Sequence, residues 1–504
     1  MRTELIFGPP GCGKTHAMVE KVREALQRGV SPDRVGFMSY TTKAVNEALG
    51  RLCREFYLTK KDFPFVKTLH GLAFHALGLQ RNDVMGPQDY VALGRILGLN
   101  FSGGVSLHPD GDWILPGDVF HDDYLRIADR AAMRMLPLEE EFRQTARYGM
   151  SYPALTQIVG TMENYKRAVH RLTFTDMLLQ YVEIGEAPRL DLLIIDEAQD
   201  LVPLQWAVVR KLMERAKEVY FVGDDDQAIH AWAGVDIQLF LNASENKTVL
   251  SQSFRLPKAV HTLCDRIVKR IDVRQSKVWF PTEREGLVSF HMDRHTVPLD
   301  QGSWTVMART NFQVSELANA MREDGYFFSR GDQRSVSMEL SVALDAWQRL
   351  NNGESILKDQ ARSLYKRLPK SGKRKALNGG AMAALETGDP EGRYSLEILV
   401  NNYGLLVNQG GLEVFDLSFD DTVYIRSLQR RGTNLLEEPK IKLSTIHAMK
   451  GGEDQKIMLL TDSTKNCATS PDQDNEHRVF YTGGSRAKEE LHVIESSRKY
   501  RYIV

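Results

Sequence analysis

Eight residues near the start of the chain have the composition of a phosphate-binding loop. The segment Gly8-Pro9-Pro10-Gly11-Cys12-Gly13-Lys14-Thr15 fits the pattern G-x-x-x-x-G-K-[ST]. Residues 3–7 before it predict a buried strand, and residues 16–26 after it predict a helix. In that setting backbone N–H groups and the helix N-terminus surround phosphate oxygens, and Lys14 adds a positive charge. With the Thr15 hydroxyl on a magnesium ion, the segment predicts a site for a nucleoside triphosphate.

Two carboxylates stand at the end of another predicted strand. The apolar residues 192–195 run directly into Asp196-Glu197-Ala198-Gln199-Asp200. Because strand ends meet at the carboxyl edge of a parallel sheet, we expect this pair beside the phosphate loop. Asp196 would hold magnesium, mostly through water. Glu197 would orient and deprotonate an attacking water molecule, so the two segments together predict a hydrolytic site.

A glutamine follows a third apolar segment, residues 219–222. The chain continues there as Gly223-Asp224-Asp225-Asp226-Gln227. Gln227 could bond the γ-phosphate or the attacking water and report hydrolysis to neighbouring elements. Taken alone, the same residues would be read as a solvated turn.

The elements that must position these residues are short apolar strands alternating with helices. The predicted strands cover residues 35–39, 192–195 and 219–222, then 304–307, 441–444, 456–460 and 491–494. Continuous apolar strands followed by helices predict parallel sheets covered on both faces. At 504 residues the chain exceeds a single core, so we expect two α/β domains. Residues 79–171 and 332–439 are mostly helical and predict insertions.

Composition limits the class of protein. The formal net charge is −1, so any nucleic-acid surface must be local. The four cysteines form no C-x-x-C pair, which argues against zinc, iron–sulfur clusters and disulfides. The sequence has no apolar run of the ~18 residues that a membrane span needs, and its N-terminus lacks a signal-peptide pattern. We therefore expect a cytoplasmic monomer that does not associate with membranes.

One tract is strongly basic. Between Lys358 and Lys375 eight lysines and arginines stand against one acidic residue, Asp359. A solvated charge run and a patch that contacts duplex phosphates are both open interpretations.

Nine further segments follow the phosphate loop in an order that is typical of one protein family. They are residues 39–44, 68–71, 174–178, 196–200, 223–232, 253–255, 308–311, 444–453 and 480–491. With them the chain resembles superfamily 1 helicases of the UvrD/Rep group over nearly its whole length. The resemblance implies an α/β fold of two RecA-like, parallel-sheet motor domains, each with a mainly helical inserted subdomain. The expected boundaries are 1–78 with 172–249, insertion 79–171, then 250–331 with 440–504, insertion 332–439.

The resemblance also implies roles around the nucleotide, which the family identifies as ATP with Mg²⁺. Arg255 and Arg486 would reach from the second motor domain across a cleft to the γ-phosphate, where forked guanidinium donors suit spreading charge. Phe254 would stack on adenine, and Glu453 would accept a hydrogen bond from the ribose. The implied catalytic residues are Lys14, Asp196, Glu197, Gln227, Arg255 and Arg486. The implied nucleotide-binding residues are Gly8, Pro9, Gly11, Cys12, Gly13, Lys14, Thr15, His16, Phe254, Gly451 and Glu453.

A nucleic-acid track is implied in the same way. The residues at family positions that contact single-stranded DNA are Tyr40, Thr41, Thr68, His70, His230, Trp232, Thr445 and His447. Trp232 is the expected stacking platform, although a lone aromatic residue is more often part of a core. Ala233 stands where the family often has arginine, which removes one nucleic-acid contact.

The activity implied by the resemblance is an ATP-driven motor. It would walk 3′ to 5′ along single-stranded DNA and separate duplexes at single-strand/duplex junctions. A translocase that displaces proteins without unwinding, a nucleotide-gated clamp and RNA as the track remain alternatives. Only seven residues precede Gly8, so the family's adenine-reading glutamine motif has no counterpart and the preference for ATP stays open.

Overall fold

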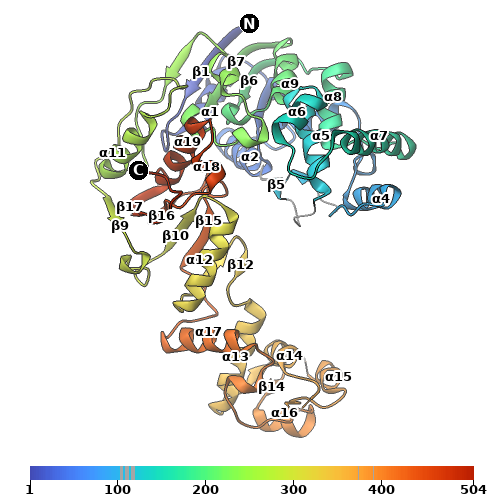
Figure 1. Ribbon diagram of the computed structural model, residues 1–504, viewed down its shortest axis with the longest axis vertical. Coiled ribbons are helices and arrows are strands. Elements are labelled where there is room, and N and C mark those ends of the chain that lie inside the picture. The colour runs from blue at the N-terminus through green and yellow to red at the C-terminus, as the bar shows by residue number, and fades with distance from the viewer. Residues whose placement is uncertain (103–105, 108–112, 115–119, 373, 390) are drawn as a thin grey trace. The chain divides into compact units, whose positions relative to one another are not determined.

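The chain forms two compact units (Figure 1). The computed structural model describes residues 1–102, 106–107, 113–114, 120–372, 374–389 and 391–504. Unit 1 comprises Met1–Val288 and Asn466–Glu489, and unit 2 comprises Ser289–Lys465 and Glu490–Val504. Both units are α/β, as predicted from the alternating pattern.

Unit 1 is built on a parallel sheet, which has six strands among the described residues. Its strand order is β3-β2-β6-β7-β1-β8, and neighbouring strands run parallel. The strands are β1 (Arg2–Phe7), β2 (Val35–Ser39), β3 (Phe65–Thr68), β6 (Leu190–Ile195), β7 (Ala216–Gly223) and β8 (Lys247–Val249). The predicted strands at residues 3–7, 35–39, 192–195 and 219–222 are thereby confirmed.

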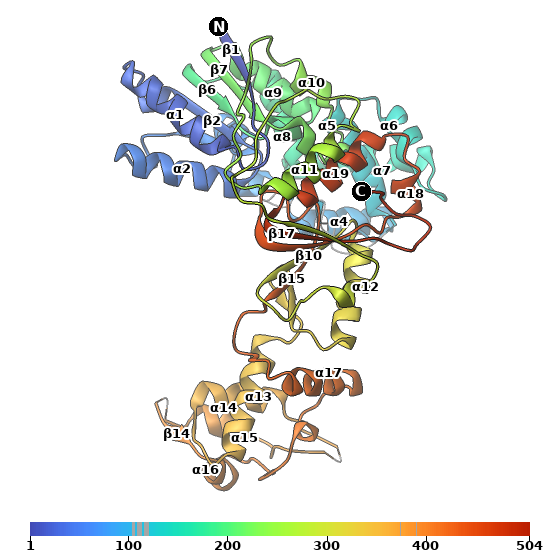
Figure 2. The ribbon, with the colours of Figure 1, turned by 90° about the vertical axis from the view of Figure 1, so that its left-hand side faces the viewer.

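Helices cover both faces of this sheet (Figure 2). On one face lie α1 (Lys14–Gln27) and α2 (Thr42–Phe56), and on the other α3 (Leu69–Ala76), α8 (Phe174–Ile184) and α9 (Pro203–Met213). In β6, Ile194 packs with the first group, whereas Leu193 and Ile195 pack with the second. Side chains alternate between the two faces of a strand, so burial of both explains the continuous apolar runs.

The first insertion has a small core of its own. Its helices are α4 (Pro87–Leu97), α5 (Asp122–Arg134), α6 (Leu138–Thr145) and α7 (Tyr152–Val169), and two short paired strands, β4 (Ser106–Leu107) and β5 (Trp113–Ile114), accompany them. Leu93, Ile127 and Ile158 from three of these helices are buried together. The helical character predicted for residues 79–171 is confirmed.

Two later segments also pack in unit 1. The helices α10 (Ile237–Leu241) and α11 (Lys258–Val268) precede unit 2 in sequence, and α19 (Gln473–Gly484) returns from it after the short α18 (Lys465–Ala468). The helix α19 packs on α11 and on the turn η4 (Asp225–Gln227). We expected residues 250–288 and 466–489 in the second motor domain, whereas backbone proximity groups them with the compact unit of the phosphate loop. The domain boundaries stay a prediction.

Unit 2 carries the second sheet, with the strand order β12-β11-β15-β10-β16-β17-β9. Its strands are β9 (Leu287–His291), β10 (Trp304–Ala308), β11 (Phe328–Arg330), β12 (Gln333–Arg334), β15 (Ile441–Thr445), β16 (Asp454–Leu460) and β17 (Ala487–Ile494). Strand β10 runs parallel to both β15 and β16. Val306, Leu443 and Met458 pack against α12 (Asn311–Glu323). The four strands predicted for this half of the chain are confirmed.

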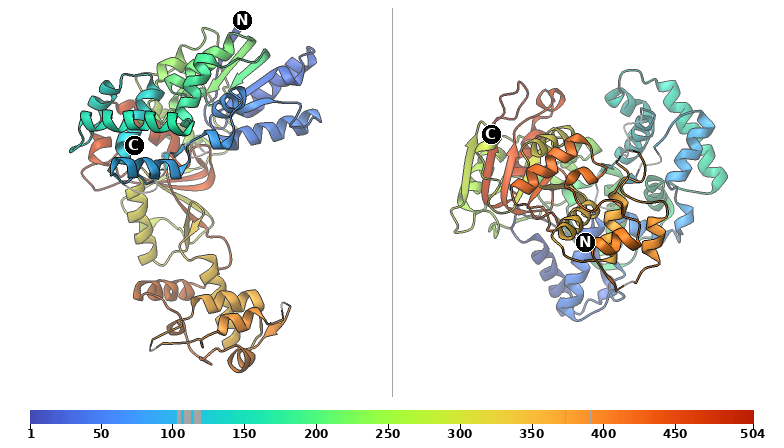
Figure 3. Two further views of the ribbon diagram at one scale, coloured as in Figure 1. Left: turned by 90° about the vertical axis from the view of Figure 1, so that its right-hand side faces the viewer. Right: turned by 90° about the horizontal axis from the view of Figure 1, so that it is seen from below.

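The second insertion forms a separate helical cluster in unit 2 (Figure 3). It contains α13 (Met338–Asn351), α14 (Lys358–Arg367), α15 (Ala381–Glu386), α16 (Leu396–Asn402) and α17 (Phe419–Arg430), with the strand pair β13 (Ile356–Leu357) and β14 (Arg393–Tyr394). Trp347, Leu364 and Leu399 lie in its core. Nowhere in the described part of the chain is a helix both long and apolar enough to cross a bilayer.

Much of the basic tract is used inside this insertion. Lys358 is buried, and its ammonium group donates to the carbonyl oxygens of Glu386 at 2.8 Å and Gly388 at 2.7 Å. Arg362 forms an ion pair with the Glu386 carboxylate at 2.6 Å. Lys358 therefore has a structural role, and the expectation of a duplex contact is wrong for that residue. Lys373 lies outside the described residues, and duplex contact by the remainder stays a prediction.

Candidate functional site

The phosphate loop joins the end of β1 to the start of α1. Gly11 and Gly13 have φ angles of 74° and 75°, a left-handed conformation that glycine adopts without strain. The first helical residue is Lys14, and its ammonium group donates to the Gly8 carbonyl oxygen at 3.0 Å. Gly13 caps α1 without a side-chain hydrogen bond, so the first N–H groups of the helix are left to a ligand. The loop therefore has the geometry of an anion site.

Cys12 is buried inside this loop. Burial first and the nearby Asp224 carboxylate second raise the pKa of its thiol to about 12. A thiol that stays protonated at neutral pH is a poor nucleophile. Cys12 is therefore a packing residue of the loop.

The two carboxylates at the end of β6 lie beside Lys14. Burial and the charge of Glu197 together raise the pKa of Asp196 to about 7, against the opposing charge of Lys14. Glu197 has a φ angle of 49°, unusual for a residue with a side chain, and its N–H donates to Asp196 Oδ1 at 2.9 Å. The left-handed backbone of Glu197 thus marks a sharp turn at the end of β6.

A chain of hydrogen bonds leads from Glu197 to Arg486. The Gln199 amide donates to Glu197 Oε2 at 2.6 Å, and its oxygen accepts from the Asp224 N–H at 3.1 Å. Asp224 Oδ2 accepts from the Gln227 amide at 2.7 Å. The Gln227 oxygen accepts from Arg486 Nη2 at 2.5 Å. Five side chains from three separate motifs are thus held in one network.

Arg486 is almost fully buried between α19 and β17. Its guanidinium group donates to the Thr482 carbonyl oxygen and the Ser485 hydroxyl, each at 2.9 Å. Burial lowers its pKa to about 10, and the positive charge of Arg255 contributes in the same direction. The side chain stays cationic at neutral pH, with Glu197 among the groups that favour its charge.

Arg255 lies against the phosphate loop. A Cβ added to Gly11 would approach the Arg255 Cβ to 2.3 Å. The two residues before Arg255 also contact the loop. The Phe254 N–H donates to the Gly11 carbonyl at 2.9 Å, and the Ser253 hydroxyl donates to the Pro10 carbonyl at 2.7 Å. We expected Arg255 and Arg486 in a second domain, reaching across a cleft. Both lie in unit 1, together with Lys14, and their contact with the γ-phosphate stays a prediction.

The expected adenine platform, Phe254, is exposed. Its ring comes within 3.8 Å of the position that a Cβ on Gly13 would occupy. His16, on the first turn of α1, is exposed as well. Both side chains can therefore meet a ligand held by the phosphate loop.

A buried lysine pairs with all three of the consecutive aspartates that precede Gln227. Lys277 Nζ lies 3.0 Å from Asp224 Oδ1 and 2.8 Å from Asp226 Oδ2, and it also pairs with Asp225. Burial lowers the pKa of Lys277, but the three carboxylate charges outweigh burial and raise the pKa above its ordinary value. The oxygens of the three aspartates are close enough to hold a metal ion, yet an ammonium group already lies among them. The cluster is therefore a buried ion network.

Three aromatic rings of the expected track lie in a row. The rings of Tyr40 and His230 are stacked at 6.1 Å, and those of His230 and Trp232 meet edge to face at 6.1 Å. His230 is buried, whereas Trp232 is 42% exposed. Trp232 is therefore exposed enough to stack directly on a base, and the buried His230 ring packs against it.

The other unit 1 residues of the expected track have structural tasks. The Thr41 hydroxyl caps α2 by accepting from Ala44 N–H at 3.1 Å, and the Thr68 hydroxyl caps α3 by accepting from Gly71 N–H at 3.0 Å. Desolvation lowers the pKa of the half-buried His70 to about 4, so its ring is neutral. Their contacts with nucleic acid remain predictions.

The remaining expected residues belong to unit 2. Thr445 ends β15, and His447, Gly451 and Glu453 follow before β16 begins at Asp454. Gly451 has a φ angle of 79°, which marks a turn in this segment. Their nucleotide and nucleic-acid roles stay as predictions.

The residues of the loop and strand edge fit the groups that the motifs imply. The uncapped start of α1, with Lys14 as its first residue, suits a triphosphate. Asp196 and Thr15 offer a carboxylate and a hydroxyl, the oxygen ligands that Mg²⁺ prefers. ATP with Mg²⁺ is thus chemically compatible with the site.

Two residues of the site were missed by sequence reasoning. Gln199 stands within the quoted Asp196–Asp200 segment, and its position next to the carboxylates could have marked it. Lys277 had no such signal, because it lies 53 residues beyond Asp224 in the chain.

Comparison with known proteins identifies the segment that carries most of this site. Residues 2–248 match the model of the UvrD/REP helicase N-terminal domain. The ATP-dependent DNA helicase PcrA of Staphylococcus epidermidis is 23% identical over 304 residues, which cover 54% of this chain and 39% of PcrA. PcrA of Staphylococcus aureus matches with the same identity and coverage. The chain thus spans about two fifths of the length of these relatives.

One solved structure also aligns with the chain. The helicase nonstructural protein 10 of an Arterivirus covers 98% of this chain and 59% of its own, with a TM-score of 0.35 and 10% identity. Residues 2–248 carry a UvrD/REP helicase N-terminal domain, and the chain is similar to UvrD/Rep-type helicases of superfamily 1 over about half of its length.

Proposed function

We propose that this protein is an ATP-dependent translocase on single-stranded DNA and a DNA helicase with 3′ to 5′ polarity. The observation that carries the proposal is the hydrogen-bond chain from Glu197 through Gln199, Asp224 and Gln227 to Arg486. It joins the residue suited to activate water to the arginine suited to stabilise the transition state.

Each residue has a chemical task in this proposal. The phosphate loop and Lys14 bind the triphosphate, and Asp196 with Thr15 positions the magnesium ion. That ion, when bound, offsets negative charge on the phosphate oxygens. Glu197 holds the attacking water and accepts its proton. Arg255 and Arg486 stabilise charge on the transferred phosphoryl group. Arginine residues in this role accelerate hydrolysis by ~10³–10⁵.

The same segment links hydrolysis to the track. Gln227 ends the turn η4, and Trp232 follows it by five residues on the turn η5 (Ala231–Ala233). A shift of the Gln227 amide on loss of the γ-phosphate would therefore be passed along a short, rigid connection to the stacking platform. Stacking on Trp232 needs no particular base, which suits a motor that moves along any sequence.

Strand release from tailed duplexes tests the proposal. With ATP and Mg²⁺, we expect release from a duplex with a 3′ single-stranded tail and little from one with a 5′ tail. Release from the 5′ tail alone would contradict the polarity. Protein displacement without strand release would favour the stripping translocase, and DNA binding without phosphate release would favour the clamp. The same assay on RNA tails compares the two tracks.

A further inference from the structure

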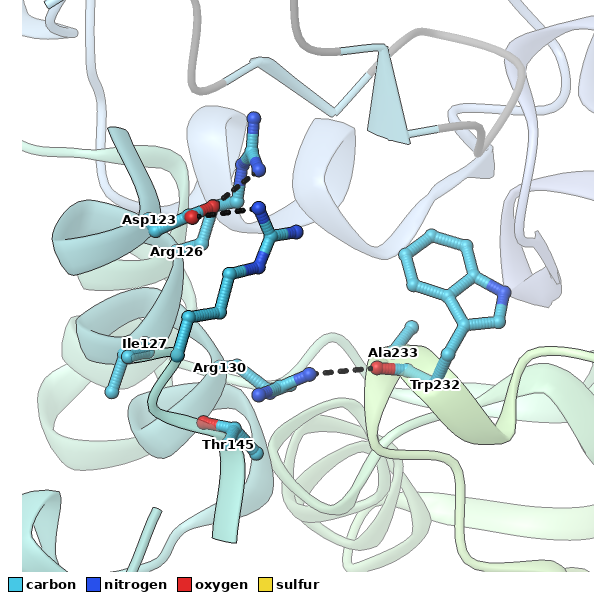
Figure 4. Close-up of a pocket in the computed structure, with 8 residues that line it drawn as sticks. Asp123, Arg126, Ile127, Arg130, Thr145, Trp232 and Ala233 are labelled. Carbon is cyan, nitrogen blue, oxygen red and sulfur yellow. Dashed lines mark hydrogen bonds and ion pairs between the residues drawn. The ribbon is translucent and has the colours of Figure 1, made fainter. Parts of the chain in front are cut away.

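Two cavities of unit 1 differ in how their charges are balanced. In the arginine-lined cavity beside Trp232, of about 160 Å³, Arg126 pairs with Asp123 at 2.5 Å and Arg130 pairs with the buried Glu141 (Figure 4). The second, which we call the amino-edge cavity, has a volume of about 470 Å³. That volume lies within the range of ~300–1,000 Å³ that is usual for ligand pockets. All of its lining residues belong to unit 1.

The amino-edge cavity lies where strands of the first sheet begin. Among its lining residues, Arg34 directly precedes β2, Arg189 precedes β6 and Arg215 precedes β7. The phosphate loop, the Asp196–Asp200 segment and the track residue Tyr40 instead follow the carboxyl ends of strands of this sheet. At ~3.3 Å per residue, the five residues of β2 separate these two edges by about 16 Å. The cavity is therefore a different place from the proposed hydrolysis site.

Two arginines of the lining are held by backbone carbonyl groups. Arg34 Nη1 donates to the Arg189 carbonyl oxygen at 3.1 Å, and Arg215 Nη1 donates to the Ala187 carbonyl oxygen at 2.8 Å. A carbonyl oxygen carries no net charge, so these bonds fix both guanidinium groups without offsetting their positive charge. Each bond uses one of the five N–H donors of its guanidinium group.

Lys67 and Arg189 add two further positive charges to the lining. Within the part of the chain that the structure describes, neither side chain forms an ion pair or a hydrogen bond. Burial and, after it, the charge of Lys67 lower the pKa of His75, which also lines the cavity. The carboxylates of the lining, Asp33 and Glu186, are exposed and form no ion pair with any described residue. Four cations and two anions thus leave an excess of two positive charges.

The buried part of the lining is apolar. Leu72 and Ala187 are buried in the core of unit 1, and Phe65 packs against the same core. A ligand in this cavity therefore meets an apolar surface with cationic side chains around it. Such a lining suits a ligand that carries both acidic and apolar groups.

We propose that the amino-edge cavity binds an acidic segment of a partner protein. Its carboxylates would pair with the arginines and Lys67, since a guanidinium fork matches a carboxylate in two hydrogen bonds, and an apolar side chain would pack on Leu72. A nucleic-acid strand fits less well. Asp33 and Glu186 would repel successive phosphates, and Phe65 is packed on the core rather than presented for base stacking. The inference goes beyond the proposed function and does not depend on it.

The test measures binding of a fluorescein-labelled peptide in which aspartate and leucine alternate, by fluorescence anisotropy. The wild type should bind this peptide saturably, and added KCl should weaken the binding. For K67A/R189A we expect a Kd at least about tenfold higher, because charge-assisted hydrogen bonds are lost. A peptide with serine in place of leucine should bind the wild type more weakly, since it buries less apolar surface.

Matched variants separate the cavity from general charge. Arg143 and Lys269 are 73% and 69% exposed and lie outside the lining, so R143A/K269A removes the same formal charge but should leave the Kd nearly unchanged. The reversed variant K67E/R189E should lose the aspartate–leucine peptide and bind a lysine–leucine peptide better than the wild type does. Urea denaturation checks that each variant is folded, and K67A and R189A measured singly serve if a double variant is not.

Each other result contradicts the proposal. Absence of saturable binding of the aspartate–leucine peptide by the wild type overturns it, and so do equal losses in R143A/K269A and K67A/R189A. Displacement of the peptide by oligo(dT), together with weaker oligo(dT) binding in K67A/R189A, would assign the cavity to nucleic acid instead. None of these results touches the proposed function, which strand release from tailed duplexes tests separately.

Discussion

Gln199 connects the two sides of the proposed hydrolysis site through its side-chain amide. The nitrogen holds Glu197 at 2.6 Å, and the oxygen holds the Asp224 N–H at 3.1 Å. The amide thus connects the carboxylate proposed to activate water to the Gln227 segment. We infer that Gln199 is a positioning residue for Glu197.

Replacing Gln199 with leucine should therefore impair turnover more than nucleotide binding. We expect kcat for ATP to fall about tenfold or more, since the carboxylate loses its orientation, while KM changes little because the phosphate loop is untouched. Steady-state phosphate release measures both constants. Q205L is the control, since Gln205 is a buried glutamine that caps α9. Equal kcat values for Q199L and the wild type would contradict the role.

The buried thiol of Cys12 leads to a chemical prediction. With a pKa of about 12, only roughly 10⁻⁴ of the thiol is ionised at pH 8, and thiolate is the reactive form. Iodoacetamide should label the half-buried Cys53 and Cys467 well before Cys12. Peptide mass spectrometry over a time course gives the rates. Labelling of Cys12 as fast as Cys53 would show a lowered pKa instead.

At the residue scale, the sequence predicts the site residues that local patterns mark and misses those that tertiary packing brings in from elsewhere in the chain. Lys14, Asp196, Glu197 and Gln227 are marked by residue type and by the strand that each follows. Glu197 could not be expected in a left-handed conformation, because that angle is imposed by the turn around it. Lys277 could not be found either, because its role arises only from tertiary packing.

At the scale of elements, the turn η4 is held by charge. Lys277 forms ion pairs with Asp224, Asp225 and Asp226 from a fully buried position, and Arg274 forms a bidentate pair with Asp226 at 2.7 Å and 2.8 Å. Arg478 on α19 adds a hydrogen bond to the Asp225 carbonyl at 3.0 Å. Through these contacts the turn η4 is fixed to α19 and to the segment that carries Arg274.

The variant K277M should lose stability because it leaves buried carboxylates unpaired. We expect a loss of about 3–5 kcal/mol at pH 8 by urea denaturation. K269M, which removes an exposed pair with Asp265, should cost less than about 1 kcal/mol.

The deficit of K277M should shrink as the pH falls toward 5. Burial already raises the pKa of Asp225 to about 6 in the presence of the ammonium group. Without that group the folded-state pKa values of the aspartates rise further, so the penalty applies above them and is relieved on protonation. A deficit that grows on acidification would contradict this account of the cluster.

The predicted elements agree with the structure where both faces of a strand are buried. The apolar runs of β2 and β6 were sufficient to place them. The strands β3 and β8 were missed, because they lie at the edges of the sheet and are only partly buried, which leaves no continuous apolar pattern. The packing of α19 on α11 could not be read from local sequence at all.

At the scale of the whole molecule, the proposal requires hydrolysis and movement to be coupled. Trp232 is the exposed member of the aromatic row and borders the arginine-lined cavity. Stacking on such a platform is worth ~1–3 kcal/mol per base. Its loss should therefore weaken the grip on the strand while the residues that bind and hydrolyse ATP stay in place.

The variant W232A should uncouple the two activities. We expect strand release from a 3′-tailed duplex to fall at least about tenfold, consistent with that stacking energy, while DNA-stimulated phosphate release falls much less. The ratio of strands released to phosphate formed is the measurement, and W232F, which keeps an aromatic face, is the control. An unchanged ratio in W232A would remove Trp232 from the track.

The most direct test of the account is phosphate release by wild type and E197Q, each with and without single-stranded DNA. The account predicts that DNA stimulates phosphate release by the wild type. E197Q should lose about 10²–10⁴ in turnover, because the amide cannot accept a proton from water. The variant should still bind a fluorescent ATP analogue. Retention of DNA-stimulated turnover by E197Q would show that hydrolysis does not take place at this site.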